Sequence, residues 1–251
     1  MEAKELTPRE SLELTALIVK NLPKGAFQRR TFDYYFSHEK ELQETLARGL
    51  VLDPPHDFVY SKSLADLGRT ECWTEIWRYA NWEFNPSGLL IPAESDGHDW
   101  LLGVPKDISA NQSLILNQHA FECDCRVNKG DLDNGIKKND RDPRTGAYFI
   151  RVRPGIQPDT ELRKLSAVQL WNQKISGMTL TERLILGWAV YLISGKHLDT
   201  EIGTMCHGTR FWNNDNVPIV RWIDEYEAVQ IDQCLSDDAP EFLGSRSVIT
   251  Q

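Results

Sequence analysis

A hydrophobic run at positions 184–193 is bounded on both sides by residues typical of helix ends. Thr179 and Glu182 have the spacing of a capping box, in which each side chain binds the other residue's backbone amide. Gly195 suits the left-handed conformation that ends many helices. Hydrophobic residues cover nearly the whole circumference of this helix, which is typical of a core. Since the run is shorter than the roughly 20 apolar residues of a membrane span, we predict a buried core helix, then a strand leading into a turn at 206–210.

The N-terminal part of the chain reads as helical. The first fifty residues contain apolar runs at helical spacing that end at turn-forming residues. One further helix, or a pair of helices, is predicted over 63–82. The densest aromatic cluster of the chain begins within this segment and extends just beyond it. We expect the cluster to lie in the core because each ring buries a large area. Its members are Trp73, Trp77, Tyr79, Trp82 and Phe84.

The middle of the chain indicates strands. Two short apolar runs, 89–91 and 100–102, flank a polar turn and predict a β-hairpin. Positions 113–116 continue the apolar signal, and 128–145 reads as a long polar loop. Such a loop is either functional or mobile.

The C-terminal part combines strands with short helices. The predicted elements are a strand at 147–152, helices at 161–165 and 166–171, a strand pair at 217–223 and 228–231, and a strand at 247–250. The fold class that follows is α+β: a helical N-terminal part, a β-rich middle, and a buried helix packed on an antiparallel C-terminal sheet. Two domain divisions remain open. One has a mainly helical region at 1–105 and an α+β domain at 106–251, and the other has a single interlocked domain.

Composition points to a protein of the reducing cytoplasm. The net charge is −9, and the start of the chain is acidic and lacks the basic and apolar pattern of a signal peptide. Five cysteines is an odd number, and the chain is long enough to fold without disulfides, so we expect buried thiols. We expect no membrane partner.

One segment departs from the acidic balance. Positions 126–164 carry 10 basic and 6 acidic residues. Such a segment can mark contact with an acidic partner, either a protein or a nucleic acid. The alternative is that it packs against the protein's own acidic parts or is a solvated loop, since acidic residues interleave with the basic ones. The candidate partner-binding residues are Lys137, Lys138, Arg141, Arg144, Arg151 and Arg153.

Cysteine and histidine positions suggest a possible metal centre. Cys123 and Cys125 could supply two zinc ligands, with His119 and Cys206 completing the set after folding. The Cys-x-Cys spacing is tighter than that of usual paired zinc cysteines. In a strand, both thiols would face the same side as core residues. We therefore expect no metal and no cofactor, and keep the metal site as an alternative.

The turn at 206–210 carries the candidate catalytic residue, His207. Adjacent strand residues point to opposite faces, so Cys206 and His207 cannot readily form an attacking pair with each other. The sequence His-Gly-Thr-Arg from His207 is similar to the histidine motif of ADP-ribosyltransferases, in which that histidine holds the ribose of the nicotinamide cofactor. In that family a tyrosine and a glutamate follow on later strands, and in this chain Tyr226 and Glu241 are the only residues that could correspond to them. Only 44 residues remain after His207, fewer than that fold normally needs.

A wider resemblance covers positions 147–249. The pieces that carry it are YFIRVR, LTERLILGWAVYLISGKHLD, CHGTR, VPIVRW and SRSVI. They resemble the C-terminal part of a group of uncharacterised bacterial proteins of no established activity, which implies an α+β unit and a bacterial or phage setting. Without a coherent catalytic set, we expect a non-enzymatic binding or regulatory protein with a protein partner. The alternatives are a Cys/His metal-dependent enzyme and a protein that contacts nucleic acid through 126–164.

Overall fold

The computed structural model describes residues 62–95, 97–212 and 215–250, so the helices expected in the first fifty residues lie outside the described part. The described helices, with η for a 3-10 helix, are η1 (Leu64–Gly68), α5 (Thr70–Tyr79), α6 (Ala110–Ala120), η2 (Asn128–Gly130), α7 (Leu132–Gly135), η3 (Pro143–Thr145), η4 (Thr160–Leu162), α8 (Ala167–Asn172), α9 (Leu180–Ser194) and η5 (Asp224–Tyr226). The strands are β1 (Trp100–Val104), β2 (Glu122–Cys125), β3 (Ile136–Asn139), β4 (Tyr148–Val152), β5 (Gly203–Met205), β6 (Thr209–Phe211), β7 (Val217–Ile223), β8 (Ala228–Cys234), β9 (Leu243–Gly244) and β10 (Val248–Ile249).

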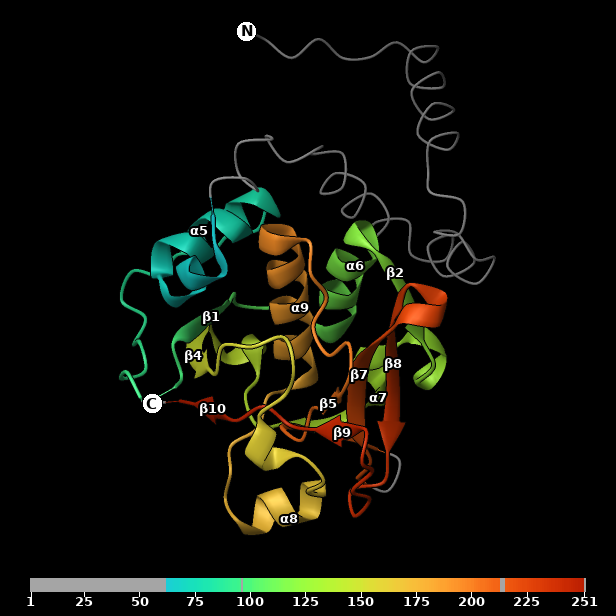
Figure 1. Cartoon of the computed structure of the whole chain (residues 1–251). Helices are drawn as coiled ribbons and strands as arrows, with labels where there is room; N and C mark the ends of the chain where they lie inside the picture. Colours follow the sequence, from blue (N-terminus) through green and yellow to red (C-terminus); the bar gives the residue numbers. More distant parts are fainter. Residues whose placement is uncertain (1–61, 96, 213–214, 251) are drawn as a thin grey trace, which may run out of the picture. The chain divides into compact units, whose positions relative to one another are not determined.

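The strands form three sheets, and the α+β class is confirmed. One sheet has the order β1-β4-β10, a second has the order β2-β8-β7-β5-β9, and β3 pairs with β6 in a two-stranded ribbon. In Figure 1, α9 stands between the three-stranded sheet and the five-stranded sheet, with α6 beside it. The first sheet joins residues on both sides of position 105, because β1 pairs with β4 along its whole length.

The central helix α9 forms as its sequence predicts. The Thr179 hydroxyl accepts from the Glu182 amide at 3.3 Å, and a Glu182 carboxylate oxygen accepts from the Thr179 amide at 2.7 Å. Gly195 ends the helix in the left-handed conformation with a φ of 65°. Of its 15 residues, 13 are buried. The helix therefore owes its stability to packing on both sheets.

Two of the three tryptophans of the aromatic cluster lie in the core, as expected, whereas Trp82 and Tyr79 are partly buried and pack against it. Trp73 and Trp77 are both 0% exposed. The Trp73 indole donates to the Leu101 carbonyl at 2.6 Å, and the Trp77 indole donates to the Gly103 carbonyl at 2.8 Å. Each ring thus fills the core while its polar N–H binds the β1 backbone.

Three expectations for the middle of the chain were wrong. No hairpin joins 89–91 to 100–102. Leu90 and Ile91 are 69% and 48% exposed, and β1 pairs instead with the distant β4, which buries it. The expected β-rich middle contains the helix α6, which packs on α9. Residues 128–145 are not one loop, since α7 and β3 lie within them and β3 finds its partner in β6.

The five-stranded sheet is mixed rather than antiparallel throughout. β7 and β8 form the expected antiparallel hairpin, with Val220 opposite Ile231. The outer strands β2 and β9 pair in parallel with β8 and β5. Only β7 and β8 are joined by a short turn, which dictates antiparallel pairing, whereas β2 and β9 come from distant parts of the chain.

Candidate functional site

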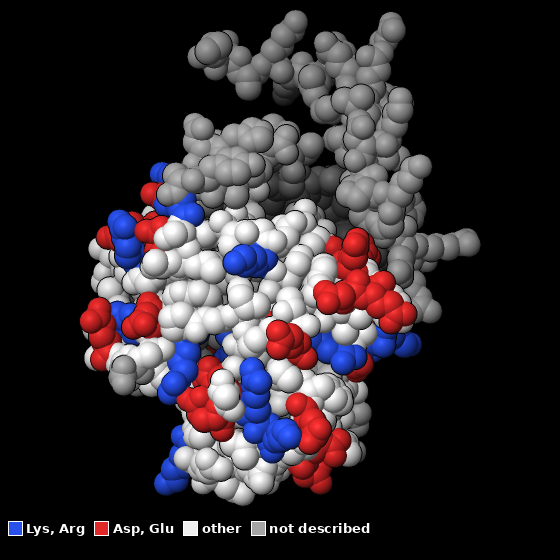
Figure 2. All heavy atoms as spheres, in the orientation of Figure 1, with Lys and Arg blue, Asp and Glu red and all other residues white. Residues whose placement is uncertain are grey.

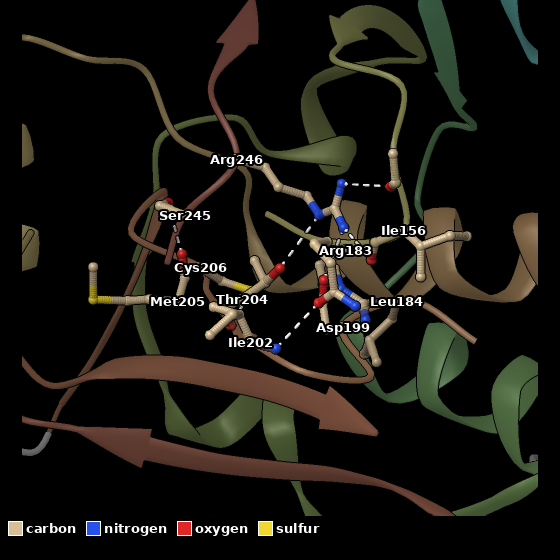
Figure 3. Close-up of polar contacts among 12 residues, drawn as sticks. Ile156, Arg183, Leu184, Asp199, Ile202, Thr204, Met205, Cys206, Ser245 and Arg246 are labelled. Carbon is tan, nitrogen blue, oxygen red and sulfur yellow. Dashed lines mark hydrogen bonds and ion pairs between the residues drawn. The ribbon is translucent and has the colours of Figure 1, made fainter. Parts of the chain in front are cut away.

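Two arginine side chains converge on one aspartate inside the protein (Figure 3). Arg183 Nε donates to Asp199 Oδ2 at 2.7 Å, and Arg246 Nη2 donates to Asp199 Oδ1 at 2.8 Å. The side chains of Arg183, Asp199 and Arg246 are 2%, 0% and 1% exposed. Because buried charges are tolerated only when they are paired and hydrogen-bonded, these three side chains depend on one another.

Arg246 extends this network to the backbone. Its Nη1 donates to the Gly155 carbonyl at 3.1 Å and its Nη2 donates to the Ile156 carbonyl at 2.9 Å, while Nε lies 3.3 Å from the Thr204 hydroxyl. The network therefore ties α9, the loop after it, β5, the segment after β4 and the C-terminal segment together. We interpret it as an internal support of the fold.

Gly187 shows how a guanidinium fits along the tightly packed α9. A Cβ at Gly187 would lie 2.4 Å from Arg183 Nη1, closer than real contacts allow. Glycine within a helix costs about 1 kcal/mol relative to alanine. The absent side chain at Gly187 thus makes room for the Arg183 head group.

A second buried network surrounds the N-terminus of α9. Glu182 accepts from Arg141 Nε at 2.6 Å and Nη2 at 2.8 Å, and from the Tyr148 hydroxyl at 2.9 Å. Burial by itself raises the pKa of Glu182, but the Arg141 charge and hydrogen bonds outweigh burial and hold that pKa below its ordinary value. Burial and the Glu182 charge raise the pKa of Tyr148. Glu182 therefore combines helix capping with an ion pair.

His207, the candidate catalytic residue, is fully buried in the turn after β5. Its Nδ1 lies 2.5 Å from Ser245 Oγ, and its Nε2 lies 3.1 Å from the Ile175 carbonyl oxygen. Because a carbonyl can only accept, Nε2 carries the proton of the neutral ring. Burial lowers the pKa of His207, which favours this neutral form.

A serine bound to a neutral imidazole is the pairing from which nucleophilic serines are built. Ser245 is nevertheless 0% exposed, and its hydroxyl donates its one proton to the Met205 carbonyl at 2.9 Å. The other residues of the ADP-ribosyltransferase motif are not brought to this pair: Tyr226 lies in η5 and Glu241 binds Lys164. We interpret the His207–Ser245 contact as a support that holds the turn after β5 against the C-terminal segment.

The cysteines considered as metal ligands belong to one hydrophobic cluster. Cys206 lies in this cluster, and Cys123 and Cys125 pack against it from β2. Burial raises the pKa of the Cys125 thiol to about 11 and raises that of Cys206 as well. His119 is exposed on α6. Across residues 62–95, 97–212 and 215–250, no three such side chains are grouped to hold a metal ion.

The six basic candidates divide into engaged and exposed residues. Arg141 binds Glu182, and Arg151 is 7% exposed with its Nε bound to the Pro92 carbonyl at 2.9 Å. Arg153 is half-buried and pairs with Glu161 at 2.9 Å. The three exposed cations each pair with a nearby carboxylate, and Figure 2 shows basic and acidic side chains interleaved on the face it displays. These pairs are Lys137–Asp215, Lys138–Asp140 and Arg144–Asp142.

A tryptophan that the sequence analysis did not select lies beside the two lysines of β3. Trp212 directly follows β6, its amide donates to the Gly135 carbonyl at 3.1 Å, and it is 67% exposed. Its neighbourhood includes Lys137 and Lys138 of β3, since β3 and β6 are paired. We call Lys137, Lys138 and Trp212, together with Arg144 of η3, which follows β3 in the chain, the ribbon surface. A tryptophan directly before the polar run Asn-Asn-Asp was the only sequence signal for its exposure.

A groove lies along the face of β7 and β8 opposite to α9. Its volume is about 510 Å³. Asp232 and Asp238 line it, together with Leu235 and Phe242, which are both 49% exposed. Asn216 also lines it; this residue is 6% exposed, and its Oδ1 has no hydrogen-bond partner among the residues that the structure describes. None of these residues was selected from the sequence, because the groove forms only when β7, β8 and the segment before β9 come together.

Comparison of the chain with models of known protein families, with curated proteins and with solved structures finds no match. In the part of the chain that the structure describes, no helix has the length and apolar character to span a membrane. The ribbon surface and the groove are therefore the features from which a function is argued.

Proposed function

We propose that the protein is a non-enzymatic binding protein and that its ribbon surface contacts an acidic segment of a partner protein. The observation that carries this proposal is the exposed Trp212 beside the exposed cations of β3. Tryptophan is enriched among the residues that dominate binding energy in protein interfaces. Leaving so large an apolar side chain in water has a hydrophobic cost that a partner would remove.

The cations of the ribbon surface can exchange partners at little cost. Lys137 and Asp215 are 41% and 46% exposed, and Lys138 and Arg144 are 59% and 82% exposed. Ion pairs between such exposed groups contribute only about 0–1 kcal/mol. An acidic partner can therefore replace the intramolecular carboxylates, whereas Arg141 is held by Glu182 and does not take part.

The test is capture of partner protein from a lysate of the native host by the tagged full-length chain, with quantification by mass spectrometry. The variant K137E/K138E/R144E and the separate variant W212S should each lose the captured partner. The control K106E/K174E/K196E changes the net charge equally at exposed lysines elsewhere and should retain it. Equal capture by all of these proteins would contradict the proposed surface.

Nucleic acid and a metal-dependent reaction are the rival functions. If the ribbon surface bound nucleic acid, affinity would fall steeply with salt, because phosphate contacts release counterions. If the wild-type chain bound labelled DNA or RNA and K137E/K138E/R144E did not, the partner in this proposal would be nucleic acid instead of protein. The net charge of −9 opposes such binding at long range.

A further inference from the structure

The groove on β7 and β8 has a lining of mixed character. The groove is open to solvent and has a volume of about 510 Å³. Exposed apolar side chains, Leu235 and Phe242, alternate in the lining with the carboxylates of Asp232 and Asp238. An occupant must therefore offer both apolar surface and positive charge.

The positions of the charges give the groove a direction. Along the hairpin, Arg221 lies opposite Gln230, and Asp232 lies two residues further along β8, opposite Ile219. Arg221 is held at its end, because its Nη2 donates to the Gln230 side chain at 2.8 Å and its guanidinium lies 5.5 Å from the centre of the Phe242 ring. The negative end is the one formed by Asp232 and Asp238.

The two carboxylates at the negative end have no ion-pair partner among the described residues. Within the described part of the chain, the Asp232 side chain accepts only from the Gln233 amide, at 2.8 Å, and the Asp238 side chain accepts no hydrogen bond. Both carboxylates lie near Cys234. Burial, followed by the charges of Asp238 and Asp232, raises the pKa of this thiol to about 12. A cation between them would relieve this uncompensated negative charge.

Asn216 supplies a second, independent indication of an occupant. An unpaired buried acceptor is unfavourable, and such groups are rare in folded proteins. The Asn216 carboxamide oxygen is such an acceptor in the wall of the groove. An N–H donor of an occupant, after a small adjustment of this side chain, would satisfy it.

We propose that this groove binds an extended segment of a partner protein that carries an arginine or lysine side chain between apolar residues. The basic head group lies at Asp232 and Asp238, and the neighbouring apolar side chains pack on Leu235 and Phe242. A small hydrated cation would leave both apolar side chains uncovered, and a second copy of this chain would bring a like net charge of −9. This surface is distinct in charge from the ribbon surface and does not depend on it.

The probe is a fluorescein-labelled peptide, ALRLRLA, titrated with the full-length chain and followed by fluorescence polarisation. Because D232N/D238N removes both carboxylates that the basic head group would contact, it should weaken the Kd by about 10-fold. The matched control is E225Q/E227Q, which removes two exposed carboxylates at the opposite end of the same hairpin and should change the Kd by less than about twofold. The ribbon variant K137E/K138E/R144E should keep the peptide affinity, which separates this proposal from the proposed function.

Several results would overturn the proposal. Absence of ALRLRLA binding at millimolar concentration would do so, as would equal binding of the acidic peptide ALELELA. If D232N/D238N and E225Q/E227Q weakened the peptide affinity equally, the peptide would be attracted by the overall charge and would not bind in the groove. Spermine binding as tight as the peptide, or a dimer that D232N/D238N dissociates, would replace the peptide segment with a small cation or a second copy.

Discussion

Replacement of Asp199 by asparagine should destabilise the protein strongly. Asp199 has a φ of 61°, and asparagine is among the residues that adopt this left-handed conformation with little strain. The size of the side chain is also unchanged, so D199N removes the charge and turns one of the two oxygens that accept from the arginines into an NH2 donor. The change leaves two guanidinium groups, which are 2% and 1% exposed, without their shared carboxylate.

The magnitude follows from the burial of these groups. A lost hydrogen bond to a charged group costs about 1.5–3 kcal/mol, and breaking a buried ion pair by removing one partner costs about 3–5 kcal/mol. We therefore expect D199N to lower the free energy of unfolding by about 3–5 kcal/mol, a large part of the 5–15 kcal/mol typical of a folded protein. Urea unfolding followed by tryptophan fluorescence measures this loss, since Trp73 and Trp77 are buried.

The matched control is D215N, the same substitution in the exposed Lys137–Asp215 pair. It should cost far less than D199N, and salt should reduce that cost because exposed charges are screened. The loss in D199N should be nearly independent of salt. A loss in D199N as small as in D215N would refute the reasoning that Arg183, Asp199 and Arg246 form a buried support.

Three further predictions concern packing, pH and thiols. G187A should lower the urea midpoint, although alanine normally stabilises a helix by about 1 kcal/mol, because its Cβ would displace the Arg183 head group; a raised midpoint would show that the guanidinium lies elsewhere. Burial, followed by the Arg183 charge, lowers the pKa of His197 to about 4. The unfolded chain therefore takes up a proton there at higher pH than the folded chain, so stability should fall as the pH drops from 6.5 towards about 4, and H197F should flatten that fall; an unchanged slope would contradict the shift. Cys125, with a pKa raised to about 11, and the fully buried Cys206 should react slowly with Ellman's reagent at about pH 8 until the protein is unfolded, because the thiolate is the reactive form; a fast reaction in the folded protein would show that these thiols are accessible.

The elements that were predicted correctly carry their information locally. Thr179, Glu182 and Gly195 mark the ends of α9 within its own sequence, and the β7–β8 hairpin has its turn between its strands. The errors involve partners that are distant in sequence. β1 was assigned to a hairpin with 89–91 because the two runs are neighbours, whereas its partner β4 lies more than forty residues later. No local pattern distinguishes these pairings.

The candidate sites were less predictable than the fold. Basic residues at 137–153 were visible as charges, but their burial was not, and Arg141 and Arg151 prove to bind internal groups. Trp212 becomes prominent only when its exposure is known. The groove combines Asn216 with residues of β8 and of the segment before β9, so tertiary structure alone brings it together.

The most direct test of the central claim, that the ribbon surface is a protein-binding site, is quantitative capture with W212S. The account predicts that W212S folds with the stability of the wild-type chain, because Trp212 is 67% exposed, but no longer captures the partner that wild-type protein and K106E/K174E/K196E both capture. Undiminished capture by folded W212S would contradict the claim.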